Sequence, residues 1–471
     1  MSAAARDWTI EALAAAIRER KISPVEATRE CLARIERLDG RLRAFITVDA
    51  DGALRAAKER EAEAAAGRWR GALHGVPLAY KDLCHVRGLP ASCGTKTREY
   101  FFAEHECTAV ARLTAAGAIT LGKLNMTELA MGPFGDNAHH GNAQNPWRPG
   151  HVTGGSSSGS AVAVAAAMAL GALGSDTGGS IRLPAGCCGI VGFKPTYSRV
   201  SRAGVMPLSW SNDHVGPMAR TVRDAALMLH VIAGHDPLDA TSSRRAVPDY
   251  LAGLDGGAAG LRVAVPENFF FRGVHPEMEA AVRLAVRTLE KLGARVTEMA
   301  VPDPQVMNDV ATIISRSEGA SAHARLARER PEEIQPVVRA RLELGFRISA
   351  YDYLQALRLR ARLTRAFIRE VFAAADVLVA PVIPEPAPPL AHATEGTIEE
   401  LTARQGRFAR LTRSINGLGL PALALPCGFS QSGLPLAMQI IGRPFDEATV
   451  LRAGQAYERD AGWAARRPPV D

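Results

Sequence analysis

The chain has 471 residues, of which 47% are hydrophobic and 22% are charged, and its formal net charge is +7 at pH 7. These values are ordinary for a globular protein and provide ample apolar material for a core. The basic excess alone would suggest nucleic-acid binding. However, basic residues are interleaved with acidic ones and long runs of like charge are absent, so we expect no nucleic-acid partner.

The first residues, MSAAARDWTIEALAAAIRERK, carry charges through the part that would have to be apolar in a signal peptide or membrane anchor. No uninterrupted apolar segment reaches the roughly 20 residues of a membrane-spanning helix. The seven cysteines form no CxxC pair, which favours reduced thiols in the cytosol. His139 and His140 lack further candidate ligands. We therefore expect a cytoplasmic protein with no membrane association and no metal site.

Residues 1–70 are predicted to be mainly helical. Trp8, Ile10, Leu13 and Ile17 recur at helical spacing, and Ser23-Pro24 is typical of a helix start. Glu26, three residues after Ser23, completes the pattern of a capping box. We expect this region to form a helical clasp around the outside of a sheet.

From Gly71 to about Gly234, short apolar strands alternate with helical runs, which predicts an α/β sheet covered on both faces. The run Gly75–Tyr80 is a candidate buried strand that ends at Lys81. A lysine at the end of a buried strand loses solvation, so its pKa falls and it can act as a base. The ordinary alternative is an ion pair between Lys81 and Asp82.

Two Gly/Ser-rich loops, Gly154–Ser160 and Gly174–Ser180, flank the apolar run Ala161–Leu173, which we interpret as a buried helix. In the second loop Gly178-Gly179 leads directly into Ser180. Successive amide N–H groups free of side-chain bulk can stabilise a developing oxyanion, and a serine at the end of such a nest can be a nucleophile. The alternative is two flexible turns around a packed helix.

Beyond Gly234, a polar and Gly-rich stretch at 235–260 predicts a surface connection. Strands are then expected within 261–269, 294–302 and 376–384, with helices over Pro276–Leu292 and most of 305–375. We expect residues 235–390 to be the more variable region that sets substrate choice.

The motifs GALHGVPLAYKD, GAITLGKLNMTELAMG, VTGGSSSGSA and GSDTGGSIRLPAGCCGIVGFKPT resemble those of the amidase signature family. Similarity continues to GLPLAMQIIGRPFDE, so it spans most of the chain from about Gly71 to Tyr457. Members of that family are serine hydrolases with a Ser–cis-Ser–Lys triad. The resemblance implies a single large α/β domain with a central mixed sheet covered on both faces by helices, residues 71–471 being the catalytic part.

Carried over by position, the resemblance places the triad lysine on Lys81, the cis-serine on Ser156 and the nucleophile on Ser180. The implied oxyanion hole consists of the backbone N–H groups of Thr177, Gly178, Gly179 and Ser180. Asp176 and Arg182 are implied to brace this loop. Met131 and Phe134 are the expected lining of the acyl pocket, with ordinary core packing as the alternative.

The resemblance implies hydrolysis of a small-molecule amide, such as a primary amide, an anilide or a carbamate, through an acyl-enzyme on Ser180, without a cofactor. A homodimer is a further expectation from the family. The alternative is the glutaminase component of a tRNA-dependent amidotransferase. Such glutaminases resemble this chain at Arg341, which in them holds the glutamine carboxylate, but the acid that they carry for the amino group corresponds here to Ala409. A non-catalytic scaffold is disfavoured by the intact lysine and both serines.

Overall fold

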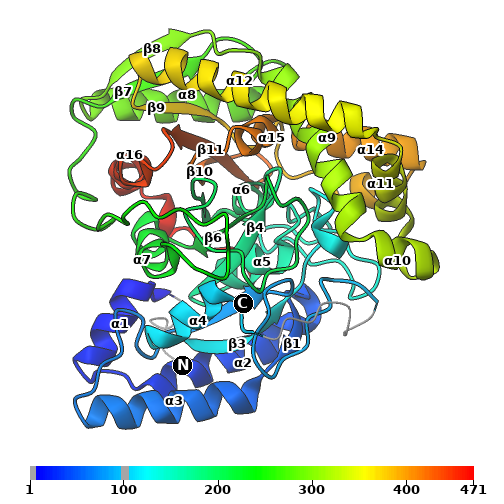
Figure 1. Cartoon of the computed structure of the whole chain (residues 1–471). Coiled ribbons are helices and arrows are strands. Elements are labelled where there is room, and N and C mark those ends of the chain that lie inside the picture. The colour runs from blue at the N-terminus through cyan, green and yellow to red at the C-terminus, as the bar shows by residue number, and fades with distance from the viewer. Residues whose placement is uncertain (1–6, 97–104, 471) are drawn as a thin grey trace.

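The computed structural model describes residues 7–96 and 105–470, and within these residues 11 strands form one sheet (Figure 1). The strands are β1 (Phe45–Val48), β2 (Pro77–Lys81), β3 (Ile119–Leu124), β4 (Gly171–Asp176), β5 (Val191–Lys194), β6 (His214–Ala219), β7 (Arg262–Pro266), β8 (Arg295–Met299), β9 (Val377–Pro381), β10 (Ala422–Phe429) and β11 (Pro435–Gly442). Their order is β1-β3-β2-β4-β6-β5-β10-β11-β9-β7-β8. β2 runs parallel to β3 and β4, and β7 runs parallel to β8 and β9, whereas the other neighbours are antiparallel.

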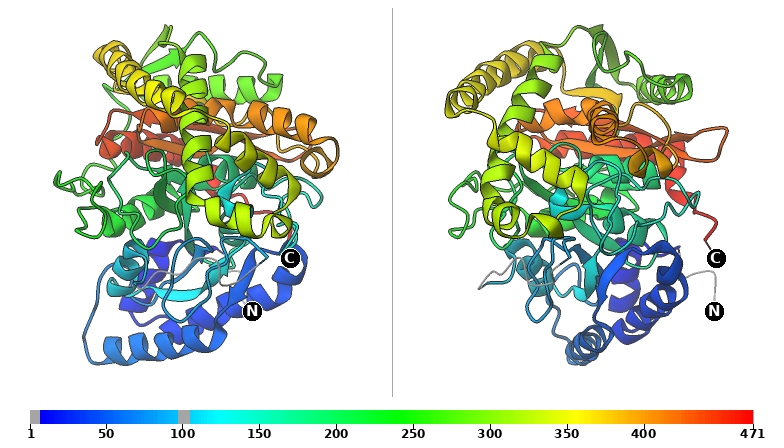
Figure 2. Two further views of the ribbon diagram at one scale, coloured as in Figure 1. Left: turned by 45° about the vertical axis from the view of Figure 1, so that its right-hand side comes forward. Right: turned by 90° about the vertical axis from the view of Figure 1, so that its right-hand side faces the viewer.

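Helices cover both faces of this mixed sheet, as predicted (Figures 1 and 2). The α-helices are α1 (Ile10–Arg18), α2 (Pro24–Leu42), α3 (Ala50–Ala65), α4 (Thr108–Ala115), α5 (Ser158–Ala165), α6 (Arg182–Cys188), α7 (Val222–Ile232), α8 (Pro276–Lys291), α9 (Pro304–Ala322), α10 (Ala324–Glu329), α11 (Pro336–Phe346), α12 (Ala350–Ala374), α13 (Ala391–Thr394), α14 (Ile398–Phe408), α15 (Arg410–Gly417) and α16 (Glu447–Ala461). Short 3-10 helices are η2 (Glu128–Ala130), η3 (Pro331–Glu333) and η4 (Trp463–Ala465). Of the described helices, none combines the length and the apolar character needed to cross a bilayer.

The N-terminal region contains the predicted helices and one strand that the sequence analysis missed. The capping box is present: the hydroxyl of Ser23 accepts from the Glu26 N–H at 3.1 Å, and the Glu26 carboxylate accepts from the Ser23 N–H at 2.8 Å. Between α2 and α3, the four residues of β1 pair antiparallel with β3 and form one edge of the sheet. The region therefore extends the sheet as well as packing helices beside it.

The run Ala161–Leu173 is not one helix, which corrects the sequence-based interpretation. α5 ends at Ala165, and Gly171 already begins β4, which lies between β2 and β6 near the middle of the sheet. A continuous apolar run fits a fully buried strand as well as a buried helix, so its composition cannot separate the two. The helix and strand together place the two Gly/Ser-rich loops at the same end of this part of the sheet.

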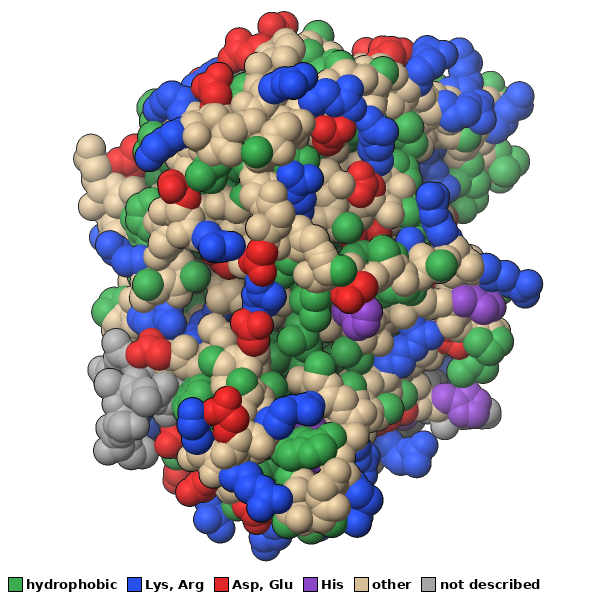
Figure 3. Space-filling model, turned by 90° about the vertical axis from the view of Figure 1, so that its left-hand side faces the viewer, with side chains coloured by type: hydrophobic (Ala, Val, Ile, Leu, Met, Phe, Trp, Pro, Cys, Tyr) green, Lys and Arg blue, Asp and Glu red, His purple; other side chains and the backbone are tan. Residues whose placement is uncertain are grey.

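The helices between β8 and β9 pack against one another and against α15, which follows β9 in the chain. α9 contacts α11, α12 and α15, and in Figures 1 and 2 these helices lie together beside the upper half of the molecule. α9, α11 and α15 all contribute side chains to the pocket described below. Elsewhere, on the face shown in Figure 3, acidic and basic side chains are interspersed, as the sequence pattern indicates.

Candidate active site

Lys81 is the last residue of β2, and its side chain is completely buried. Its Nζ lies 2.7 Å from Ser156 Oγ and 2.9 Å from Ser175 Oγ. Burial lowers the pKa of Lys81 from its ordinary value to about 7, because desolvation disfavours the charged amine. The neutral amine that a general base requires is therefore accessible near neutral pH.

Ser156 is held by the loop that precedes α5, and the Gly155–Ser156 peptide bond is cis. The Gly155 N–H donates to the carbonyl of Pro133 at 2.7 Å, and the Ser156 carbonyl accepts from the Thr127 N–H at 3.1 Å. Only glycine fits at position 155, because an added Cβ would lie 2.6 Å from the backbone nitrogen of Gly135. These contacts fix the serine that faces Lys81.

Ser180 lies in the turn between β4 and α6, next to the Ser156 loop. The Ser157 N–H donates to the Ser180 carbonyl at 3.2 Å, so the residue after Ser156 contacts the residue predicted to be the nucleophile. Within the described part of the chain, no hydrogen bond joins the hydroxyls of Ser156 and Ser180. Lys81 and Ser156 are therefore in direct contact, and the Ser180 loop is hydrogen-bonded to the loop that carries Ser156.

Asp176 and Arg182 pair with each other on the buried side of the loop that carries Ser180. Arg182 Nε donates to Asp176 Oδ2 at 3.1 Å, and both side chains are completely buried. Burial alone would raise the pKa of Asp176, but Arg182 together with Lys194 and the Asn416 amide holds it well below its usual range. Asp176 also accepts from the N–H groups of Gly179 and Ile181, so these contacts are consistent with a bracing role, which stays a prediction.

The candidate oxyanion hole differs from the expectation at one residue. The Gly179 N–H donates to Asp176 Oδ1 at 2.7 Å, so this amide is engaged inside the loop and does not face a substrate. The amides of Thr177, Gly178 and Ser180 remain the candidates, and all three residues line the pocket. Gly179 has a φ of +133°, and an added Cβ would lie 2.2 Å from Thr412 Oγ1, so the loop needs glycine at this position.

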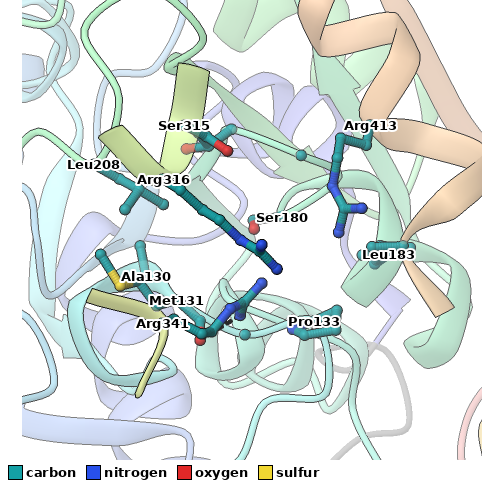
Figure 4. A pocket seen from close by; sticks show the side chains of 14 residues that line it. Ala130, Met131, Pro133, Ser180, Leu183, Leu208, Ser315, Arg316, Arg341 and Arg413 are labelled. Atoms are coloured by element: carbon teal, nitrogen blue, oxygen red, sulfur yellow. Dashed lines mark hydrogen bonds between the residues drawn. The ribbon is translucent and has the colours of Figure 1, made fainter. Parts of the chain in front are cut away.

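A pocket opens in front of Ser180, with apolar walls that include Met131, Leu183 and Leu208 (Figure 4). Met131 lines this pocket, where the sequence analysis expected it. Phe134 instead lies in the core, completely buried, with its ring centroid 4.9 Å from that of Phe408. This position corresponds to the core-packing alternative for Phe134.

Comparison with known proteins supports the resemblance to amidases that the sequence motifs indicate. The sequence model of the family described as Amidase matches residues 26–451. The chain belongs to the amidase family. A relative from Roseiflexus sp. (strain RS-1) is 42% identical over 96% of this chain and 96% of its own length, and it is named as the A subunit of glutamyl-tRNA(Gln) amidotransferase.

Two solved structures of amidase-signature proteins have the same fold. One is a chain of a vestigial protein complex, described as revealing the evolutionary origins of an s-triazine catabolic enzyme. Its TM-score is 0.90, with 33% sequence identity over 97% of this chain and 99% of that chain. The other is a peptide amidase in complex with the competitive inhibitor chymostatin, with a TM-score of 0.87 and 31% identity over 98% of each chain. The protein is accordingly an amidase-type enzyme that acts on C–N bonds.

This amidase brings polar residues to its pocket that the sequence motifs did not identify. Arg316 of α9 and Arg413 of α15 line it together with Arg341 of α11, the residue carried over from the amidotransferase resemblance. Ala409, where an acid was expected in an amidotransferase glutaminase, also lines the pocket. Arg316 and Arg413 carry no local signal, since each is one of many helix arginines and only the packing of α9 against α15 brings them together.

No group of three or more His, Cys, Asp or Glu side chains in residues 7–96 and 105–470 is arranged to hold a metal ion. His139 Nε2 lies 2.8 Å from Glu128 Oε1, and His140 Nε2 lies 2.9 Å from the carbonyl of Thr95. Both imidazoles are thus engaged in local hydrogen bonds.

Proposed function

We propose that this amidase hydrolyses a carboxylic amide through an acyl-enzyme on Ser180, with Lys81 as the base and Ser156 as the proton carrier between them. The observation that carries the proposal is the 2.7 Å distance between Lys81 Nζ and Ser156 Oγ, both completely buried, next to a pocket that Ser180 lines. A serine hydroxyl is a weak nucleophile and needs such a base.

In the first half of the reaction, neutral Lys81 takes the proton of Ser156, which in turn takes the proton of Ser180. Ser180 Oγ attacks the amide carbonyl carbon, and the carbonyl oxygen becomes an oxyanion that the amides of Thr177, Gly178 and Ser180 can stabilise. When the C–N bond breaks, the proton returns through Ser156 to the leaving amine. The products of this half are the free amine and an ester on Ser180.

In the second half, water takes the place of the amine. Lys81 and Ser156 accept a proton from the water as it attacks the ester carbonyl, and Ser180 regains its proton when the acyl–oxygen bond breaks. The carboxylic acid leaves, and the enzyme returns to its starting protonation state. No further reactant is required.

Two forms of this activity are open to the chain, and the names of its relatives favour the glutaminase of an amidotransferase. The Roseiflexus relative that matches nearly the whole chain is named as the A subunit of glutamyl-tRNA(Gln) amidotransferase. In that form Arg341 would bind the carboxylate of glutamine, and the protein would act with partner subunits. The stand-alone hydrolase is the second candidate, and Ala409 favours it because the pocket then lacks the acid for glutamine's ammonium group. A homodimer and a cytoplasmic location remain predictions.

The test is to purify the chain alone and assay glutamine beside a primary amide, an anilide and a carbamate, with a fluorophosphonate probe for Ser180. Turnover of any of these amides that depends on Ser180 supports the shared chemistry. Hydrolysis without partner subunits favours the stand-alone enzyme, whereas activity that appears only with amidotransferase partner subunits favours the glutaminase. Failure of both turnover and Ser180 labelling in every arrangement would contradict the proposal.

A further inference from the structure

The pocket in front of Ser180 is lined by three arginines that come from three different helices. Arg316 belongs to α9, Arg341 to α11 and Arg413 to α15. In Figure 4 their guanidinium groups point toward one another across the space in front of Ser180. Three cationic groups at one small site repel each other unless an anion lies between them.

Two of these side chains are held close to the reacting centre by neighbouring contacts. Arg341 Nη1 donates to the Met131 carbonyl at 2.9 Å. Next to Arg413, Thr412 Oγ1 donates to the Gly178 carbonyl at 2.7 Å, which joins α15 to the nucleophile loop. A Cβ placed on Gly178 would lie 3.8 Å from Arg413 Nε, so this guanidinium lies directly beside an oxyanion-hole residue.

Within the described residues, these three arginines lack the carboxylate partners that the buried Arg60, Arg182 and Arg199 have. No acidic side chain in residues 7–96 and 105–470 forms an ion pair with any of them, and no Asp or Glu lines the pocket. Asp136 acts on Arg341 and Asp309 on Arg413 through the electrostatic field, without an ion pair. By contrast, Arg182, which is also buried, is paired with Asp176.

The pKa values of the three arginines reflect burial first and, for Arg341 and Arg413, neighbouring positive charge second. Burial, followed by repulsion from the other two arginines, lowers the pKa of Arg341 to about 9. Burial and then Arg316 lower the pKa of Arg413 to about 10, and burial lowers that of Arg316. All three groups still carry their charge at neutral pH, so the site as a whole is strongly cationic.

We propose that the substrate is a small amide whose acyl part carries two carboxylates, one bound by Arg341 and the other by Arg316 and Arg413. This inference rests on the proposed amide hydrolysis at Ser180 and adds the charge of the substrate to it. Glutamine has one carboxylate and one ammonium group, and its ammonium would lie among arginines with no acid at Ala409 to accept it. The pocket therefore selects against glutamine and for a dianion.

The preferred charge of the substrate can be tested with three amides that share the carbon skeleton of glutamine. Glutamine carries an ammonium group beside its carboxylate, glutaramate carries hydrogen there, and 2-(2-carbamoylethyl)malonate carries a second carboxylate. We expect kcat/KM to rise in that order, by about tenfold or more between the ends of the series, because each charged hydrogen bond contributes strongly in a desolvated pocket. Equal or better hydrolysis of glutamine than of the malonate would overturn the proposal.

Single substitutions test whether Arg316 and Arg413 bind the substrate or only support the fold. Arg316→Gln and Arg413→Gln should each lower kcat/KM for the malonate by about tenfold or more relative to kcat/KM for the neutral hexanamide, measured on the same variant. Arg325→Gln is the matched control, since its side chain is exposed on α10 and pairs with Glu329. Equal losses for the dianion and the neutral amide would show that the two arginines serve the fold rather than the substrate.

A binding measurement keeps this inference distinct from the proposed catalysis. Calorimetry on Ser180→Ala should show tighter binding of the malonate than of glutamine, whether or not the wild-type protein turns either over. If hexanamide is hydrolysed through Ser180 but the malonate does not bind, the proposed hydrolysis is supported and the proposed dianion site is wrong. If the malonate binds but no amide is cleaved and the probe does not label Ser180, the dianion site is supported and the proposed hydrolysis is wrong.

Discussion

Lys123 Nζ lies 3.3 Å from Asp82 Oδ1, although Asp82 directly follows Lys81 in the chain. Because Asp82 pairs with Lys123, it is not the ion-pair partner of Lys81 that the sequence analysis left as the alternative. Lys81 instead faces two hydroxyls, which can hydrogen-bond to a neutral amine but do not balance a buried positive charge. Because Lys81 has no carboxylate in contact among the described residues while Lys123 has one, we expect the proposed base to be neutral near pH 7 and the rate to depend on pH accordingly.

The first prediction is that kcat/KM rises with pH and levels off above about pH 7, the pKa to which burial lowers Lys81. The active form is the neutral amine, so protonation below that pKa should reduce the rate about tenfold per pH unit. The measurement is a kcat/KM profile on a neutral amide, whose own charge does not change. A flat or falling profile between about pH 6 and pH 9 would remove Lys81 from the role of base.

The second prediction concerns the nucleophile. Ser180→Ala should lower kcat by about a thousandfold or more and abolish fluorophosphonate labelling, since losses of a triad member cost several powers of ten. The fold should survive, because only one hydroxyl is removed. Ser317→Ala is a suitable control: its hydroxyl donates to the Ile313 carbonyl within α9 and takes no part in the site. Retention of more than about a hundredth of the rate would place the nucleophile elsewhere.

Local sequence signals account for much of the fold and for the centre of the site. The alternation of strands and helices, the strand that ends at Lys81 and the glycine-lined turn at Ser180 all depend on short stretches of chain. β1 could not be predicted because its four residues stabilise nothing alone and become a strand only through pairing with β3. The division of the run Ala161–Leu173 is likewise decided by neighbouring strands.

The remaining pocket residues depend on contacts between distant parts of the chain. The engagement of the Gly179 N–H follows from how the loop folds back on Asp176, which no residue pattern reveals. Phe134 is next to pocket residues in sequence, yet its ring packs against Phe408, far along the chain. Arg316 and Arg413 meet only because their helices pack together.

The third prediction is that Arg182→Met lowers the free energy of unfolding by about 3–5 kcal/mol, because it leaves the carboxylate of Asp176 buried without its charged partner. The folded-state pKa of Asp176 lies below its unfolded value, so the pair contributes stability above about pH 4 and loses it as the pH falls. The destabilisation should therefore shrink when denaturant unfolding is measured at acidic pH. Arg325→Met, which removes an exposed pair with Glu329, should cost about 1 kcal/mol or less.

The fourth prediction uses the glycine that shapes the nucleophile loop. Gly179→Ala should destabilise the protein by about 1–3 kcal/mol and lower kcat sharply, because the φ of +133° is unfavourable for alanine and the new methyl group would meet Thr412 Oγ1 at 2.2 Å. Relief of that overlap requires α15 or the loop to move, which displaces the oxyanion-hole amides from the nucleophile.

Gly406→Ala is the matched control for that substitution. Gly406 lies in α14, and an added Cβ has no heavy atom within 4 Å, so the change should stabilise the helix by up to about 1 kcal/mol and leave activity unchanged. Both variants add one methyl group, and they differ only in backbone conformation and surroundings. If Gly179→Ala retained wild-type kcat, the exact shape of this turn would not matter for catalysis, and stabilisation of the oxyanion would have to come from groups outside it.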